Sequence, residues 1–279
     1  MENLRFYKEE ENNDPLFAQK LAKLADVYVD DAFGTAHRKH ASVYGVAKLL
    51  PNAVGFLMGK EINGIKSVID NPERPLIAIL GGAKVSDKIA LINHFTDKCN
   101  TILIGGGMAY TFLKATGVNV ANSLVDDEKI EVAKEILEKA KQNNVKIVLP
   151  VDYLCATEFS PNAKAKRFVG NIADGYQGLD IGPKTIKMFK KEIANANSLI
   201  WNGPLGVFEF KNFCKGTMAI AKSVLKFKGK AVVGGGDSIS AIHKVGKTDK
   251  IYHVSSGGGA SLKLMAGESL PGVDVIEEC

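Results

Sequence analysis

Three runs of three glycines each follow a short apolar stretch in this chain. With the apolar residues before them, they form the segments Thr101–Gly107, Ala231–Gly236 and Tyr252–Gly259. Each segment precedes residues that can be helical. A strand that ends in glycine and leads into a helix leaves backbone N–H groups uncovered, and such groups bind phosphate or lie against a flat aromatic base. Three junctions of this kind predict a nucleotide-binding α/β domain.

The region from Pro75 onward alternates between expected strands and expected helices. Residues 76–80 are all apolar, which is typical of a strand buried on both faces of a parallel sheet. The other expected strands are residues 101–104, 145–149, 199–202, 231–233 and 252–254. The expected helices are residues 86–95, 108–115, 127–140, 183–194, 213–227, 238–245 and 260–265. This alternation predicts a doubly wound parallel sheet in a three-layer α/β/α domain, with an irregular polar stretch between 150 and 182.

The first fifty residues follow a different pattern, with an expected helix at 15–25 and a single expected strand at 27–29. One strand cannot make a sheet, and so short a segment buries too little to be stable alone. We therefore expect the remnant of a second α/β lobe whose earlier strands are absent. The expected domains are residues 1–51 for this remnant, 52–71 for an interdomain hinge helix, 72–266 for the nucleotide-binding lobe and 267–279 for a tail that returns to the first lobe.

The net charge of +5 raises the question of nucleic acid as a partner. The lysines are spread along expected helix faces, and no basic run with interleaved aromatic residues occurs, so we expect no nucleic acid and favour a small anionic substrate. The four cysteines, Cys99, Cys155, Cys214 and Cys279, lie far apart in sequence, which indicates reduced thiols. No apolar run reaches the roughly 20 residues of a membrane span, and no signal peptide is recognised. We expect a cytoplasmic protein without membrane association.

Two familiar phosphate-binding motifs are incomplete. Residues 246–248 (Gly-Lys-Thr) lack the glycine that a P-loop requires five positions earlier, where the chain has Ala241. The glycine runs also lack the third glycine of the dinucleotide-binding pattern, which would fall at Tyr110, Ile239 or Leu262. These departures count against a nicotinamide-dependent dehydrogenase.

Two lysines follow the expected strand 76–80. Lys84 and Lys88 are four residues apart in the segment Gly81–Lys88, so on a helix they share a face. Two ammonium groups on one face repel each other unless a polyanion bridges them. A solvated helix face is the alternative for a single lysine pair, but the paired glycines at the strand end favour a phosphate site.

Two further segments combine glycine with polar side chains. In Gly234–Ser238, the free amides suit phosphate oxygens, and Asp237 makes sense beside them if it holds Mg²⁺. The alternative is that Asp237 or Ser238 only caps the helix. In Trp201–Glu209, Asn202 offers a donor for phosphate and Glu209 an acceptor for ribose hydroxyls, although a purely structural loop would look similar.

Two arginines and two histidines in the first lobe form a candidate anion-binding group. They are Arg5, His37, Arg38 and His40. Arginine recognises carboxylate and phosphate groups with two parallel hydrogen bonds, so the group indicates a site for such a ligand. The remaining histidines are interpreted as structural or surface residues.

The ordered set of motifs resembles the phosphoglycerate kinase family over essentially the whole chain. The resemblance rests on Glu2–Phe6, Asp31–Arg38, Gly81–Lys88, Trp201–Glu209, Gly234–Ser238 and Ser255–Ser261. It implies a two-lobed glycolytic enzyme, a monomer when full length, whose lobes close around the substrates. Such an enzyme transfers a phosphoryl group reversibly from 1,3-bisphosphoglycerate to ADP with Mg²⁺, giving 3-phosphoglycerate and ATP.

The resemblance also implies roles for particular residues. Lys84, Lys88, Asp237 and Arg38 would be catalytic, with Lys84 at the phosphoryl group in flight and Asp237 at the metal. Arg5, His37, Arg38 and His40 would bind phosphoglycerate. The nucleotide would contact Lys84, Lys88, Asn202, Glu209, Gly235, Gly236, Asp237 and Ser238, with Gly82, Gly106, Gly107 and Gly178 around adenine.

The family has a complete sheet in its first lobe, and roughly its first hundred residues have no counterpart here. Two hypotheses follow from this departure. The chain is part of an active phosphoglycerate kinase, or it is a non-catalytic ADP- and ATP-binding module that retains only the nucleotide lobe. In either case we expect weak Mg-ADP binding and little turnover from this polypeptide alone.

Overall fold

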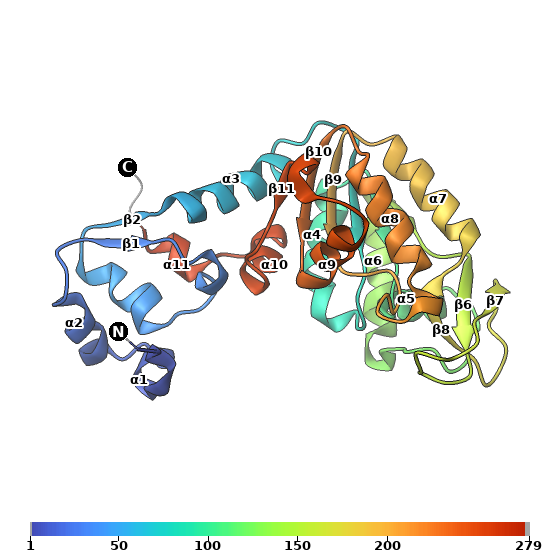
Figure 1. Cartoon of the computed structure of the whole chain (residues 1–279), viewed down its shortest axis with the longest axis horizontal. Coiled ribbons are helices and arrows are strands. Elements are labelled where there is room, and N and C mark those ends of the chain that lie inside the picture. The colour runs from blue at the N-terminus through green and yellow to red at the C-terminus, as the bar shows by residue number, and fades with distance from the viewer. Residues whose placement is uncertain (1, 277–279) are drawn as a thin grey trace. The chain divides into compact units, whose positions relative to one another are not determined.

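The computed structural model describes residues 2–276, and the chain forms two compact units (Figure 1). The first unit comprises the residues up to Lys66 together with those from Ser255 onward. The second unit is Ser67–Val254. Cys279, one of the four expected reduced thiols, lies outside the described residues, whereas Cys99, Cys155 and Cys214 are free thiols.

The second unit is built on a six-stranded parallel sheet, as the sequence predicts. Its strands are β3 (Leu76–Leu80), β4 (Thr101–Ile104), β5 (Lys146–Val148), β9 (Ser198–Asn202), β10 (Lys230–Gly234) and β11 (His253–Val254). Their order across the sheet is β11-β10-β9-β3-β4-β5, and all pairs are parallel. The chain adds strands on both sides of the central β3–β9 pair: β4 and β5 follow next to β3, and β10 and β11 follow next to β9. Ligands of doubly wound sheets bind at the carboxyl ends of such a pair.

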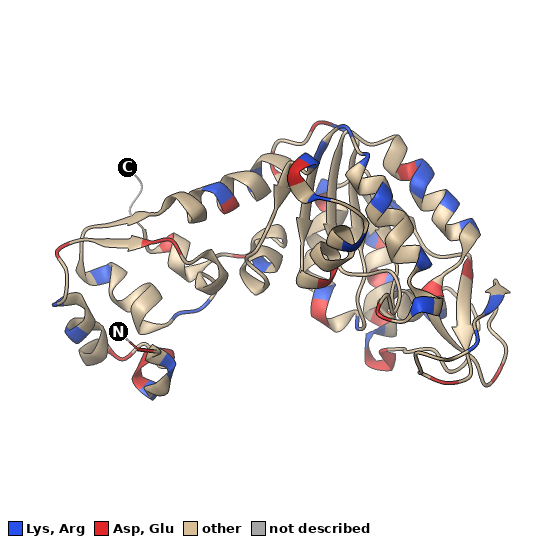
Figure 2. Ribbon diagram, viewed as in Figure 1, with Lys and Arg blue, Asp and Glu red and all other residues tan. Residues whose placement is uncertain are grey.

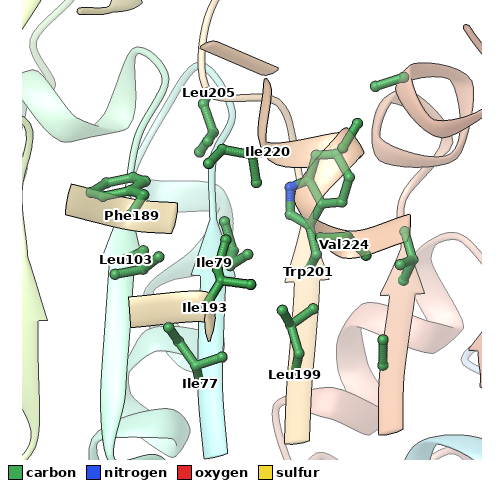
Figure 3. Close-up of a cluster of buried hydrophobic side chains, with 14 of the residues drawn as sticks. Ile77, Ile79, Leu103, Phe189, Ile193, Leu199, Trp201, Leu205, Ile220 and Val224 are labelled. Atoms are coloured by element: carbon green, nitrogen blue, oxygen red, sulfur yellow. The ribbon is translucent and has the colours of Figure 1, made fainter. Parts of the chain in front are cut away.

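Helices cover both faces of this sheet. They are α4 (Ile89–Lys98), α5 (Met108–Ala115), α6 (Ile130–Gln142), α7 (Pro183–Ala194), α8 (Lys215–Leu225) and α9 (Gly236–Val245). On one face, Trp201 and Ile79 pack against Phe189 of α7 and Ile220 of α8 (Figure 3). All five residues of β3 are buried, so its other face is also covered, on the side of α4 and α6 (Figure 1). The three-layer α/β/α prediction is confirmed.

The prediction of an irregular stretch between 150 and 182 is wrong. These residues form a three-stranded antiparallel sheet of β6 (Asp152–Ala156), β7 (Lys166–Val169) and β8 (Gln177–Ile181), in the order β7-β6-β8. The strands escape recognition because Asp152 and Asp180 are polar yet buried inside them, and because β7 is mostly exposed. Apolar patterning reveals a strand only when burial and apolar character coincide.

The first unit contains one strand more than the sequence analysis expects. Up to residue 54 its elements are η1 (Leu4–Phe6), α1 (Lys8–Glu11), α2 (Pro15–Ala22), β1 (Tyr28–Asp30), η2 (Phe33–Thr35), η3 (Ala41–Gly45), η4 (Ala47–Leu49) and β2 (Asn52–Val54). Helix α3 (Phe56–Ile69) follows and crosses the boundary between the units at Lys66. Strand β2, expected as the start of the helix, instead pairs in parallel with β1, and Gly55 N–H donates to Asp30 O at 2.7 Å beyond the last pair. Val29 is nevertheless 57% exposed, although parallel sheets usually have both faces covered.

The last described helices, α10 (Gly259–Met265) and α11 (Pro271–Asp274), lie in the first unit. The sequence analysis grouped residues up to 266 with the nucleotide lobe, whereas the contacts divide the chain before α10. Gly257 packs so closely on η2 that an added Cβ would lie 2.3 Å from the Phe33 ring. Farther on, Gly272 N–H donates to Ala36 O at 2.8 Å. Residues 277–279 of the expected tail lie outside the described residues.

The basic side chains of the second unit are spread over several helices, among them α7 (Figure 2). Within residues 2–276, no helix combines the length and the apolar character that crossing a membrane requires.

Candidate functional site

The glycine-containing turns that follow the central strands meet at the carboxyl edge of the second unit's sheet. Gly81 N–H donates to Asn202 O at 3.0 Å, which joins the turns after β3 and β9. Gly82 N–H donates to Pro204 O, and Gly106 N–H to Leu205 O, both at 3.0 Å. The turn after β9 is therefore held to the turns after β3 and β4 by backbone hydrogen bonds.

Glycine is required at Gly106. Its φ is +68°, in the left-handed region, and an added Cβ would lie 2.7 Å from Gly82 N and Gly82 O. A larger residue would strain the backbone and separate two turns that touch each other. Gly82 and Gly106, two of the glycines expected around adenine, are therefore in direct backbone contact.

These turns border a cavity of about 680 Å³ at the β3–β9 switch point. Six of the residues expected to bind nucleotide line it, namely Gly82, Gly106, Gly107, Gly178, Glu209 and Asp237. Its other lining residues are mostly apolar and include Tyr110, Leu124, Phe159, Leu179, Pro204, Leu205, Val207 and Phe210. A concave, mainly apolar cavity with a few polar groups is the usual form of a small-molecule site. We call the space lined by these residues the nucleotide cavity, and its volume is large enough for a base between apolar side chains.

The sequence analysis missed the aromatic and aliphatic part of this wall. Phe159 lies on the loop between β6 and β7, and its ring centroid is 5.0 Å from that of Phe210. Phe159 lines the cavity and is 63% exposed. A phenylalanine isolated among polar residues was the available signal, but nothing in the sequence joins that loop to the glycine turns.

Lys88 lies beside Asn202, the last residue of β9. Its Nζ donates to the backbone O of Asn202 at 3.0 Å and also to the side-chain Oδ1 of that residue. Burial lowers the pKa of Lys88 to about 8, and the nearby carboxylates of Asp87 and Asp237 oppose this shift. The structure therefore brings together Lys88, Asn202 and Asp237 from three different segments.

Lys84 is placed differently, with an exposed side chain. It borders a neighbouring hollow of about 540 Å³ together with Ala83, Leu124 and the acidic segment 126–128. Ala83 and Leu124 also line the nucleotide cavity. Lys84 is thus adjacent to the cavity without lining it.

Helix α9 begins directly at the glycine run 234–236. Gly235 has a φ of +86° and precedes the helix, and Asp237 in the first turn is exposed. Ser238 is fully buried, and its Oγ accepts a hydrogen bond from Gly203 N–H at 2.7 Å. Its hydroxyl therefore stabilises the turn after β9.

The metal-binding potential of the site is limited to single carboxylates. Among residues 2–276, no three or more His, Cys, Asp or Glu side chains gather in a way that could hold a metal ion. Mg²⁺ commonly takes one or two protein carboxylates and completes its shell with phosphate oxygens and water. Asp237, exposed at the cavity, fits that requirement.

The residues expected to bind phosphoglycerate lie in the first unit. Arg5 is exposed in η1, whereas His37 and Arg38 are half-buried. Burial lowers the pKa of His37, and the positive charges of Arg38 and Lys263 add to this effect. His40 is buried, with Nδ1 3.8 Å from Oε1 of buried Glu10.

Comparison with known proteins agrees with this geometry. Residues 1–268 match the family model described as phosphoglycerate kinase. The chain is 53% identical over 283 residues to phosphoglycerate kinase of Rippkaea orientalis, and 51% identical over 283 residues to "Phosphoglycerate kinase 3, cytosolic" of Arabidopsis thaliana. Each alignment covers 100% of this chain and 71% of the relative. The solved structure of phosphoglycerate kinase from Coxiella burnetii aligns with a TM-score of 0.93 at 40% identity, over 98% of this chain and 71% of that one.

Proposed function

The chain belongs to the phosphoglycerate kinase family, and we propose that it serves the reversible, Mg²⁺-dependent transfer of a phosphoryl group from 1,3-bisphosphoglycerate to ADP. The observation that carries this proposal is the nucleotide cavity, which opens at the β3–β9 switch point between glycine turns and apolar side chains. The family match favours a kinase over a non-catalytic nucleotide-binding module.

The cavity suits the two ends of ADP differently. Adenine would lie between the backbone of Gly106 and Gly107 and the apolar wall that includes Leu124 and Phe159. Glu209, exposed at the cavity, would accept hydrogen bonds from ribose hydroxyls. The phosphates would then extend toward the first turn of α9, where free N–H groups and the helix dipole favour negative charge.

Three side chains would act on the phosphates. Lys88 would leave Asn202 Oδ1 to pair with a phosphate oxygen, and the freed Asn202 amide would bind phosphate as well. Ser238 would contribute its backbone N–H, while its fully buried hydroxyl accepts a hydrogen bond from Gly203 N–H. Lys84, exposed beside the cavity, would stabilise the phosphoryl group in flight.

Asp237 would hold Mg²⁺ together with the nucleotide phosphates. When bound, the ion neutralises charge on the phosphate oxygens. A loose, metaphosphate-like transition state requires positioning and positive charge more than covalent participation. The lysines and the α9 amides can supply both.

The first unit would bind the phosphoglycerate. Arg5, His37 and Arg38 would contact its phosphate and carboxylate groups, since guanidinium groups recognise both. His40 would orient this group of residues through Glu10, whose carboxylate also accepts a hydrogen bond from Ser42 N–H at 2.9 Å. We further propose a cytoplasmic monomer, in keeping with the cytosolic relative, with α3 as the hinge element.

The test is to titrate Mg-ADP into the purified chain by calorimetry and to follow turnover in a coupled assay beside a full-length relative. We expect measurable but weak binding, and turnover well below that of the relative. The physical reason is that β1 and β2 form a sheet of two strands with Val29 57% exposed, and so small a sheet contributes little stability. Absence of Mg-ADP binding would contradict the proposed function, and turnover equal to that of the relative would contradict the expected loss of activity.

A further inference from the structure

A buried carboxyl group lies immediately behind the nucleotide cavity. Asp180 of β8 follows the cavity-lining Leu179 and is 1% exposed. Its Oδ2 accepts from Gly216 N–H at 2.8 Å, and its Oδ1 accepts from Ile181 N–H at 2.9 Å. Burial raises the pKa of Asp180 well above its ordinary value, and the two N–H donors oppose that shift. A carboxyl group is costly to bury unless hydrogen bonds compensate for the loss of water, and these two N–H donors provide that compensation.

Two glycines from different segments pack directly against this carboxyl group. A Cβ added to Gly206, which lines the nucleotide cavity, would lie 2.3 Å from Asp180 Oδ1. A Cβ added to Gly216, in the first turn of α8, would lie 2.2 Å from the same atom. The cavity loop and the start of α8 therefore both rest on Asp180, with no room for a side chain between them.

Hydrogen bonds continue from α8 to the cavity wall. Thr217 Oγ1 accepts from Leu205 N–H at 3.0 Å, next to the Gly216 amide that Asp180 holds. Leu205 O in turn accepts from Gly106 N–H at 3.0 Å. Leu205 and Gly106 both line the nucleotide cavity, so a continuous series of contacts joins the buried carboxyl group to the wall expected to face the base.

We propose that Asp180 is a positioning residue for the nucleotide. By holding the first turn of α8 and the loop at Gly206, its carboxyl group fixes the cavity wall at the distance that the base and ribose require. This inference rests on the proposed function, because it takes nucleotide as the ligand of the cavity.

Asp152 offers a matched control in the neighbouring strand. It is fully buried in β6, and its carboxylate accepts from Thr185 N–H at 2.8 Å and Lys184 N–H at 3.0 Å in the first turn of α7. Asp152 and Asp180 thus share burial and a relation to a helix start, and Asp152 differs in also pairing with Arg167, whose Nη2 lies 2.8 Å from its Oδ2. Neither Asp152 nor its partners line the nucleotide cavity.

The test compares Asp180→Asn with Asp152→Asn by two measurements, the dissociation constant for Mg-ADP and the free energy of unfolding in urea. Asparagine places an NH₂ group where a carboxyl oxygen accepts an N–H, so both variants should lose stability. Only Asp180→Asn should bind Mg-ADP more weakly, by about tenfold, with Asp152→Asn within about twofold of the unmodified chain. The stability readout separates a general loss of folding from a displaced wall.

Thr217→Val provides a second route if Asp180→Asn fails to fold. It removes the acceptor for Leu205 N–H while keeping the shape of the side chain, and it should weaken Mg-ADP binding in the same direction. Unchanged affinity in either variant, or equal weakening in Asp152→Asn, overturns the positioning role while leaving the proposed function intact. Failure of the unmodified chain to bind Mg-ADP overturns both.

Discussion

The ammonium group of Lys88 donates to two oxygen atoms of Asn202: Nζ lies 3.0 Å from the backbone O and also contacts the side-chain Oδ1. Neither of these oxygen atoms carries a formal charge, and burial lowers the pKa of Lys88 to about 8. Phosphate brought to this position would favour the charged ammonium. Nucleotide binding and protonation of Lys88 should therefore be linked.

The direction of this linkage follows from comparing the pKa of Lys88 in the free protein with its higher pKa beside phosphate. In the free protein at pH 9, a lysine with a pKa of about 8 is roughly nine-tenths neutral. Phosphate raises its pKa, so Mg-ADP binding at pH 9 should take up nearly one proton, and binding at pH 7 almost none. Calorimetry in two buffers of different ionisation enthalpy measures the number directly.

Lys88→Arg is the matched variant for that experiment, because a guanidinium group stays charged at pH 9. It should bind Mg-ADP with almost no proton uptake at either pH. If this variant takes up as many protons at pH 9 as the unmodified chain, Lys88 is not the group that titrates.

Lys84→Ala should separate chemistry from binding. Lys84 is exposed and adjacent to the nucleotide cavity without lining it, so its loss should leave the dissociation constant for Mg-ADP within about twofold. Removing one charged donor aimed at the transition state typically lowers kcat by about 100-fold or more. Parallel calorimetry and coupled assays of residual turnover check this, and a large loss of ADP affinity would assign Lys84 to ground-state binding instead.

Asp237→Ala should abolish the effect of Mg²⁺ on ADP affinity. In the unmodified chain, removing Mg²⁺ with EDTA should weaken ADP binding, because in the proposed function Asp237 would share the ion with the phosphates. In the variant, ADP affinity should be the same with Mg²⁺ and with EDTA. Glu209→Ala, which alters the other exposed carboxylate of the cavity, serves as the control and should keep the Mg²⁺ response at lower affinity.

Gly106→Ala should remove nucleotide binding through sterics. Its φ of +68° makes alanine unfavourable by about 1–3 kcal/mol, and its Cβ would collide with Gly82. Gly117→Ala has a similar φ of +87°, but an added Cβ there has nothing within 4 Å. Both variants should unfold at lower urea concentration, whereas only Gly106→Ala should lose Mg-ADP affinity; equal affinities would contradict the backbone wall.

The parallel sheet could be predicted from the sequence because most residues of its strands are apolar, and residues 76–80 are all so. The antiparallel sheet could not, because Asp152 and Asp180 place buried polar groups in strands where patterning leads one to expect apolar residues. Strand β2 could not be predicted for another reason. Its three residues gain their strand conformation from pairing with β1, a contact that spans more than twenty residues and leaves no local signature.

The site divides in the same way. Gly106 and Asp237 could be placed from the sequence, since glycine after a strand and a carboxylate at a helix start have local meaning. Phe159 could not, because its role arises only when its loop lies beside Phe210. The resemblance implies that Ser238 contacts the nucleotide, and its sequence neighbours give no sign that its hydroxyl also accepts from Gly203 N–H.

The central claim is that Mg-ADP occupies the nucleotide cavity of the second unit. Amide chemical-shift mapping of the isotope-labelled chain during Mg-ADP titration tests it most directly. The account predicts that the largest shifts fall on Gly82, Gly106, Gly178 and the first turn of α9. Shifts confined to the first unit, or to α7 and β6 away from the cavity, would contradict it.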